Sequence, residues 1–351
     1  MATHAEAITI DVADPHFYPL EFDWNEATVV VREMDRASFS RSTFLDHRIA
    51  AASGRVLAMP ERVYAEEAEA LPDAGVPVHF VFHVAFCGST LVCRVLDMEG
   101  KSLTYKEPRI LHQLAFGRRA TDPGADQAAR IDRLLRASNR LLRRTFADTE
   151  AAIVKPTDSS ANLALDLLRL NPGARALLLY RPLRPFLSSI LKAPDRRQYM
   201  RGMVSRAQAD LQRHGELATV DPAALSDGCV AAYVWTALMY DFISILKVRD
   251  HEIRTLDAEL LATHPGPVLA SITRLFGIPM TDAEVASSVE HGAFRWESKL
   301  TTQPFDAESY RVGEEGQRLS LAEEITEAVE WLSDLTRDRP LPRVLPHPLP
   351  T

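Results

Sequence analysis

The sequence has few cysteines and no hydrophobic run at its start. Only Cys87, Cys93 and Cys229 occur among 351 residues, all within apolar or helical patterns, which argues against a disulfide framework and fits a reducing compartment. The opening residues, MATHAEAITIDVADPHF, contain early carboxylates and no long apolar stretch, so we expect neither a signal peptide nor a transit peptide. The sequence therefore predicts a cytoplasmic protein.

Positive charge is also not in excess. Lys and Arg number 40 against 48 Asp and Glu, a formal net charge of -8, so broad attraction to nucleic acid or to an anionic membrane is not expected. Any anion that this protein binds must be bound locally. The 46% of hydrophobic residues allows a large core, enough for one large α/β domain with additions or for two domains.

The most apolar stretch, Gly228 to Val248, does not have the features of a membrane span. Asp241 interrupts it, Asp227 and Lys247 flank it, and its uncharged part is shorter than the roughly 20 residues that a bilayer requires. We therefore predict a buried helix of a globular core.

From Val78 onward, short apolar runs alternate with helical patterns. The pattern predicts strands at 78–84, 103–105, 151–154 and 176–180, with helices at 126–146 and 160–170 between them. Strands separated by helices are typical of an α/β fold, in which a parallel sheet is flanked by helices. In such sheets ligands bind beyond the carboxyl ends of the strands.

The segments on either side of this pattern have a different composition. Residues 1–75 contain β-like runs at 8–10 and 27–32 and the helical pattern TFLDHRIAAA at 43–52, and we interpret them as an N-terminal accessory subregion. Residues 76–335 form the predicted α/β domain, with a helical C-terminal part. Residues 336–351 are a proline-rich tail that we expect to be extended, either packed over the surface or disordered.

A turn of small residues, Cys87 to Thr90, joins the first core strand to a helical pattern. The first N–H groups of a helix lack internal partners and lie at the positive end of the helix dipole, so they form a cradle for an anion. Gly88 permits close approach of the backbone, and the Ser89 and Thr90 hydroxyls are hydrogen-bond donors. The turn alone is also compatible with a simple helix cap. The nucleotidase pattern G-x-x-x-x-G-K-[ST] is absent, which disfavours hydrolysis of ATP or GTP.

A second candidate anion site follows the predicted strand 176–180. Arg181 comes directly after that strand, and Ser188 and Ser189 follow within a short helical pattern. Because parallel strands end at the same rim of a sheet, Arg181 is predicted to lie on the same rim as the Cys87 turn, where it can donate two N–H groups to a phosphate. Two anion-binding features on one rim indicate a ligand with phosphates at both ends.

Together these features resemble the sulfotransferases that use PAPS (3′-phosphoadenosine 5′-phosphosulfate), a family with a P-loop-NTPase-like fold. The resemblance rests on AFCGSTL at 85–91, on an arginine and a serine eight positions apart, and on VKPTDSSANLALDLLRLNPGARALLLYR at 154–181. It extends to 254–279, which is similar to a helical segment of the family, and it covers about residues 78–300. It leaves the N-terminal segment unexplained.

The resemblance implies a set of residues that bind the cofactor. It assigns the 5′-phosphosulfate to the loop, the 3′-phosphate to Arg181 and Ser189, and a further phosphate contact to Lys299. The residues assigned to the loop are Phe86, Cys87, Gly88, Ser89 and Thr90.

This chain departs from the family at two positions of the loop. Phe86 stands where the family usually has Lys or Arg, and Cys87 stands in place of serine. The missing cation would stabilise the leaving oxygen, so another residue must supply it. The candidates are Lys155, Lys106 and Lys299, of which Lys155 is favoured because it lies at a strand end.

The resemblance also implies a general base for the acceptor. Glu107, in TYKEPRIL, follows the second predicted strand and matches the family's glutamate. The residue-level alternative is a carboxylate at a helix start, with Pro108 at the first helical position. His83 and His112 are further alternatives for the base. No metal site is expected, because the histidines share no ligand spacing with a cysteine pair.

The predicted activity is transfer of a sulfuryl group from PAPS to a hydroxyl or amine of a small-molecule or peptide acceptor, by in-line attack without a metal. Nucleic-acid and membrane partners are not expected. Two alternatives stay open: a P-loop kinase that uses ATP with magnesium, and a non-catalytic nucleotide-binding relative. A cysteine hydrolase acting through Cys87 is disfavoured, because no His/Asn arrangement accompanies it.

Overall fold

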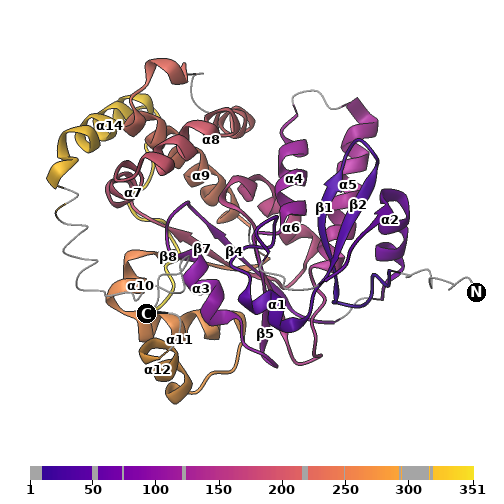
Figure 1. Cartoon of the computed structure of the whole chain (residues 1–351). Coiled ribbons are helices and arrows are strands. Elements are labelled where there is room, and N and C mark those ends of the chain that lie inside the picture. The colour runs from indigo at the N-terminus through magenta and orange to yellow at the C-terminus, as the bar shows by residue number, and fades with distance from the viewer. Residues whose placement is uncertain are drawn as a thin grey trace, which may run out of the picture.

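A parallel sheet of five strands forms the centre of the molecule (Figure 1). The computed structural model describes residues 10–49, 54–72, 75–120, 124–215, 220–248, 250–291, 294, 316 and 319–351. The strand order is β5-β6-β4-β7-β8, and every neighbouring pair is parallel. The strands are β4 (Val78–His83), β5 (Ser102–Lys106), β6 (Ala151–Lys155), β7 (Arg175–Tyr180) and β8 (Glu252–Asp257).

The predicted α/β class, a parallel sheet flanked by helices, is confirmed. The four predicted strands are present within two residues of their expected bounds. The fifth strand, β8, was not predicted. The resemblance predicts a helical segment from residue 254, and this is wrong for residues 254–257, which belong to the strand. The chain adds β5 and β6 on one side of β4 and β7 and β8 on the other, so the order changes direction at β4, where α/β sheets bind ligands.

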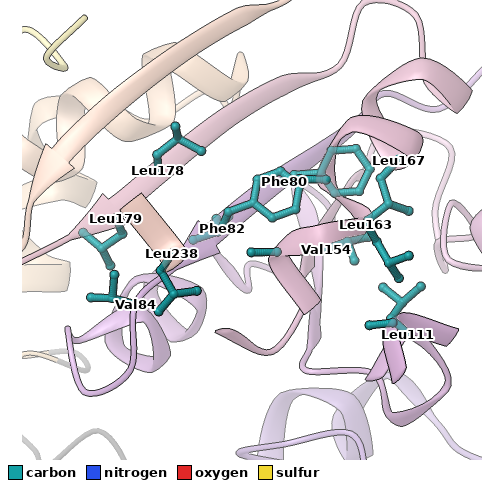
Figure 2. Packing of buried hydrophobic residues seen from close by; sticks show 14 of the residues in the cluster. Phe80, Phe82, Val84, Leu111, Val154, Leu163, Leu167, Leu178, Leu179 and Leu238 are labelled. Carbon is teal, nitrogen blue, oxygen red and sulfur yellow. The ribbon is translucent and has the colours of Figure 1, made fainter. Parts of the chain in front are cut away.

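The central strand is buried on both faces because helices cover both. Phe80 and Phe82 lie on one face of β4 with their rings stacked 5.7 Å apart, and Leu163 and Leu167 lie beside Phe80 (Figure 2). On the other face, the ring of His79 stacks on a phenylalanine of α11 (Pro265–Phe276). A strand that is buried along its whole length is typical of a parallel sheet covered on both faces.

The helices between the strands follow the predicted alternation, with altered bounds. The helix expected at 126–146 is α5 (Gly124–Leu141), and the one expected at 160–170 begins earlier as the 3₁₀ turn η1 (Asp158–Leu163) and continues as α6 (Ala164–Leu170). The loop after β4 leads into α3 (Ser89–Leu96), and α4 (Arg109–Arg118) follows β5.

The N-terminal residues form a separate antiparallel sheet, β1-β2-β3, beside α5 (Figure 1). The strand predicted at 27–32 is present as β2, whereas residues 8 and 9 lie outside the described residues. The elements are β1 (Phe17–Asp23), β2 (Thr28–Glu33), α1 (Arg36–Arg41), β3 (Val56–Pro60) and α2 (Glu61–Ala70).

The helix predicted from Thr43 is wrong over 43–49, where the chain bends irregularly. The N–H group of Leu45 donates to the Lys106 carbonyl at 2.7 Å, and the Leu45 carbonyl accepts from the Arg109 N–H at 3.3 Å and the Tyr18 hydroxyl at 3.0 Å. These backbone groups therefore bond to the edge of the central sheet instead of to a helical turn. The consequence is that an N-terminal segment reaches the end of β5.

The C-terminal part is helical. Its central helix, α9, is mostly buried between α8 and α14, so the prediction of a buried helix at 228–248 is confirmed, although its length and composition would also allow a membrane span. The elements are α7 (Leu183–Leu191), α8 (Pro194–Arg213), η2 (Pro222–Ala224), α9 (Asp227–Ile245), α10 (Glu259–Thr263), α12 (Asp282–Glu290) and α14 (Ala322–Leu335).

The proline-rich tail is packed along the edge strand β8. Leu345 and Leu349 are buried, and the Leu349 N–H donates to the Thr255 carbonyl at 2.8 Å. The Thr255 N–H in turn donates to the His347 carbonyl at 2.9 Å. The tail therefore covers a strand edge that would otherwise be open.

Candidate functional site

A cavity of about 290 Å³ lies at the carboxyl ends of the central strands. The loop between β4 and α3 forms one wall, and Phe44 and Arg48 of the irregular N-terminal segment form another. Glu107 follows β5, and Asp158 follows β6. The cavity thus lies on the rim of the sheet where the sequence predicts the ligand.

The loop between β4 and α3 has the backbone geometry of an anion cradle. Gly88 caps the helix with φ 84°, in the left-handed region, and α3 begins at Ser89. The first N–H groups of α3 have no partners within the helix, and the helix dipole is positive at this end. The side chains of Ser89 and Thr90 are almost fully buried at the cavity wall. This end of α3 can therefore bind an anion.

Cys87 contributes no thiolate to this loop. Its side chain is buried, and burial raises the pKa of the thiol to about 11, against the lowering influence of Ser89, Arg181 and Lys155. The thiol is protonated at neutral pH. Cys87 therefore acts as a small packing residue in this loop.

Lys155 and Glu107 form an ion pair beside the cavity. Lys155 Nζ lies 2.5 Å from Glu107 Oε1, with the lysine side chain 0% exposed and the glutamate 16% exposed. Burial lowers the pKa of Lys155, but the attraction of the Glu107 carboxylate outweighs burial and the net pKa is raised. Lys155 is thus held as an ammonium at neutral pH in a buried position.

Two residues at the cavity adopt a backbone conformation that is unfavourable for side chains. Phe86 and Glu107 both have φ 55° without being glycine. Such residues cost about 1–3 kcal/mol each and persist where surrounding structure holds them. At Glu107 the holding contact is its N–H group, which donates to the Lys155 carbonyl at 2.7 Å. The strain aims the Glu107 side chain at the cavity.

His83 lies behind the ion pair as a neutral ring. Its Nδ1 lies 2.9 Å from the Val84 carbonyl and its Nε2 lies 3.1 Å from the Pro156 carbonyl and 3.9 Å from Glu107 Oε1. Burial lowers the pKa of His83, and the Lys155 charge lowers it further. His112, the other histidine considered as a base, is not among the cavity-lining residues.

Phe86, at the position of the family's loop cation, contacts a cation from another element. The guanidinium carbon of Arg196, on α8, lies 4.5 Å from the centroid of the Phe86 ring. The Tyr199 ring packs edge-on against the same phenylalanine at 5.8 Å. A cation over an aromatic face is attracted to it by the ring quadrupole. Positive charge therefore reaches this loop through Arg196.

Arg181 lies on the rim that the sequence predicts. It follows β7, which pairs in parallel with β4, and its side chain is 8% exposed. Its charge reaches the loop, because it lowers the pKa of Cys87 against the effect of burial. The Arg181 carbonyl accepts from Trp235 Nε1 at 2.9 Å. Arg181 is not among the residues that line the 290 Å³ cavity.

The remaining predicted residues have other surroundings. The Ser189 hydroxyl is buried and donates to the Phe186 carbonyl of its own helix at 2.8 Å. Lys106 is buried and donates to Asp97 Oδ2 at 3.0 Å and to the Ser40 carbonyl at 3.2 Å. Its ammonium group is therefore paired with Asp97, next to α3, and Lys106 is not among the cavity-lining residues. Lys299 lies outside the described residues.

Five residues of the site have no counterpart among the sequence predictions: Phe44, Arg48, Asp158, Asp195 and Tyr199. The Arg48 guanidinium lies 3.9 Å from the Phe44 ring centroid and pairs with Asp46 through Nε at 2.9 Å. Tyr199 donates to Asp158 Oδ1 at 2.6 Å. The one usable signal in the sequence was the place of Asp158, directly after a predicted strand.

Solved structures similar to this chain include three named sulfotransferases. For STF9 from Mycobacterium avium the identity is 12% and the TM-score 0.38, over 76% of this chain and 80% of that chain. For STF1 from Mycobacterium tuberculosis the identity is 14% and the TM-score 0.35, over 75% and 81%. For the sulfotransferase domain of the curacin biosynthetic pathway the identity is 13% and the TM-score 0.36, over 62% and 80%.

No model of a protein family matches the sequence, and no curated protein matches it either. The three solved structures share only 12–14% identity with this chain, at TM-scores of 0.35–0.38. The function proposed below therefore rests on the residues of this chain and not on these similarities.

Proposed function

We propose that this protein transfers a sulfuryl group from PAPS to a hydroxyl or amine acceptor. The observation that carries the proposal is that Glu107 lines one cavity with the N-terminus of α3 and is paired with the buried ammonium of Lys155 behind it. A carboxylate can accept the acceptor's proton, an anion cradle can bind the donor, and a nearby cation can stabilise the leaving oxygen, so these groups suit sulfuryl transfer.

The donor would bind through the main chain of the loop and through Arg181. The N–H groups of Gly88, Ser89 and Thr90 suit the 5′-phosphosulfate, because they lie at the positive end of α3. Arg181, at the end of the neighbouring strand, suits the 3′-phosphate. The cavity volume is at the small end of the range for ligand pockets, so it suits the reacting end of the nucleotide and part of the acceptor.

The acceptor would lose its proton to Glu107 as it attacks. A lone pair of the acceptor oxygen or nitrogen forms a bond to sulfur, the bond between sulfur and the bridging phosphate oxygen breaks, and PAP leaves with that electron pair. As Glu107 takes up the proton, its attraction for Lys155 falls. The ammonium charge is then uncompensated at the moment when negative charge develops on the departing phosphate. Lys155 thus supplies the cation that position 86 lacks, with Arg196 as a second source of positive charge.

Ligand-dependent thermal melting tests the proposal. PAP is expected to raise the melting temperature well above the effect of AMP or Mg-ATP, because only a ligand that binds the native state stabilises it. Arg181→Ala should remove the excess of PAP over AMP, whereas Arg169→Ala, on a 75% exposed arginine of α6, should leave it unchanged. Stabilisation by Mg-ATP above PAP would favour a P-loop kinase and refute the proposal.

Turnover decides between an enzyme and a binding protein. A mass-spectrometric screen of hydroxyl and amine acceptors with PAPS should reveal a product heavier by one sulfuryl group. Phe86 in place of a cation is the observation that favours a non-catalytic relative. Binding of PAP without any sulfated product across the screen would support that alternative.

A further inference from the structure

Asp158 lies in the wall of the cavity with one carboxylate oxygen unused. It opens η1 directly after β6 and is 4% exposed. Its Oδ1 accepts from the Ser159 N–H at 2.8 Å and from the Tyr199 hydroxyl at 2.6 Å. Its Oδ2 is buried and has no hydrogen-bond partner among the described residues. One oxygen is therefore fully occupied and the other is left without a donor.

An unpaired buried carboxylate oxygen is unfavourable, because it loses water and gains nothing in return. The neighbouring groups do not relieve this. Tyr199 already donates its single hydroxyl proton to Oδ1, and its pKa is raised well above the ordinary value by burial and by the Asp158 charge, so it stays a donor. A molecule bound in the cavity can supply the missing donor.

The cation that lines the cavity and the buried cation next to it are both paired with other carboxylates. Arg48, in the cavity wall, is paired with Asp46, and Lys155, behind the wall, is paired with Glu107. Among the described residues no ion pair reaches Asp158, which lines the cavity and has one buried carboxylate oxygen without a protein partner. A cationic donor gives a shorter and stronger hydrogen bond to a carboxylate than a neutral one does.

We propose that Asp158 is an acceptor-binding residue that selects acceptors carrying a protonated amine. The proposal rests on the sulfuryl transfer proposed above and adds the class of acceptor: an amino alcohol, an amino sugar or a phenol with an aminoalkyl side chain, in which a second hydroxyl or amine reacts. The roles are then divided between two carboxylates. Glu107 removes the proton of the reacting group, and Asp158 holds the ammonium group of the same molecule.

Matched pairs of small molecules test this in the full chain saturated with PAP. Each pair differs by an amine: ethanolamine against ethylene glycol, glucosamine against glucose, and tyramine against 4-ethylphenol. Calorimetric titration should show at least one amine binding about tenfold more tightly than its neutral partner, which corresponds to about 1.4 kcal/mol. The same amine should yield the sulfated product when PAPS replaces PAP.

Asp158→Asn should abolish the preference and leave the PAP shift intact, because the amide oxygen still accepts from Tyr199. The matched control is Asp195→Asn, which removes an exposed carboxylate from the same cavity and should retain the preference. Melting without ligand establishes that both variants fold.

The outcomes separate this inference from the proposed function. A normal PAP shift with no amine preference in any pair, or with a preference that survives Asp158→Asn, overturns the role of Asp158 alone. Absence of a PAP shift in the unmodified chain overturns the proposed function, and with it the assignment of the amine as an acceptor. A preference confined to the unmodified chain and to Asp195→Asn supports the inference.

Discussion

Lys155 Nζ and Glu107 Oε1 lie 2.5 Å apart, at the ends of two adjacent parallel strands. The strand register places Lys106 opposite Lys155. Glu107 follows Lys106 and is therefore close enough to pair with the Lys155 ammonium. Because Lys155 is fully buried, the pair is part of the folded structure and not a mobile surface contact. Both the stability of the fold and the enzymatic activity should therefore depend on the Lys155–Glu107 pair. Suitable variants can separate the effect on stability from the effect on activity.

Glu107→Gln should lower kcat by at least about 100-fold, because the amide cannot accept the acceptor's proton. It should also lower the free energy of unfolding by about 3–5 kcal/mol, since a buried ammonium is left without a counter-charge. Steady-state kinetics and urea denaturation measure the two effects.

The double variant Glu107→Gln/Lys155→Met is the control. It removes the unpaired charge and should recover most of the lost stability, while activity stays absent. Equal instability of the single and double variants would show that the ion pair does not hold the two residues together. Full activity of Glu107→Gln would assign the base to another group.

Gly88→Ala should impair both the fold and anion binding. At φ 84° an alanine costs about 1–2 kcal/mol, and the added methyl group would stand 3.4 Å from Leu261 Cδ1 beside the loop. Gly173 has φ 80° with nothing within 4 Å of an added Cβ, so Gly173→Ala is a matched control for backbone strain. We expect similar losses in melting temperature for both variants, and a loss of PAP affinity in Gly88→Ala alone. An equal effect of both variants on PAP affinity would contradict the cradle.

The parts of the site that the sequence predicts are those set by local backbone structure. The turn from β4 into α3 is encoded by adjacent residues, and parallel strands place Arg181 on the same rim without further information. The sequence places Lys155 and Glu107 at this rim for the same reason, because Lys155 ends β6 and Glu107 follows β5, but it does not predict the ion pair between them.

The rest of the site depends on contacts between distant segments. Residues 43–49 have a helical pattern, yet Leu45 bonds to Lys106, which is far along the chain, and this carries Phe44 and Arg48 into the cavity. Tyr199 meets Asp158 only because α8 crosses the rim. The direction of the Ser189 hydroxyl depends on its own helix backbone and not on its spacing from Arg181. No sequence pattern contains such information.

Arg144 forms hydrogen bonds that connect residues 12–17 of the N-terminal region to the end of α5. Its buried guanidinium donates to the carbonyls of Asp14 at 2.8 Å and Phe17 at 3.1 Å, as well as to Val12 and Leu141. Arg144→Met should lower the free energy of unfolding by about 3–5 kcal/mol, because several buried carbonyls lose their donors together. Urea denaturation measures the loss. Arg169→Met, on an arginine that is 75% exposed, is the comparison, and an equal loss there would contradict this role of Arg144.

His79 should make the protein sensitive to mild acid. The ring is 4% exposed, stacks on Phe276 and accepts the Arg175 N–H at Nδ1, 3.1 Å away. Burial, reinforced by the Arg175 charge, lowers the pKa of His79 from 6.5 to about 4. Between pH 6.5 and about 4, His79 therefore binds a proton in the unfolded chain but not in the folded chain. The stability contributed by the neutral ring is fully present above pH 6.5 and is lost as the pH falls through 6.5 toward 4.

The loss amounts to about 3 kcal/mol over that interval, at about 1.4 kcal/mol per pH unit. Other groups also titrate there, so the informative quantity is the difference in unfolding free energy between the natural chain and His79→Gln, whose amide oxygen can still accept from Arg175. The natural chain should lose about 3 kcal/mol of unfolding free energy relative to His79→Gln as the pH falls from 6.5 to 4. If this difference in unfolding free energy did not change with pH, the buried ring would bind its proton as readily in the folded chain as in the unfolded chain.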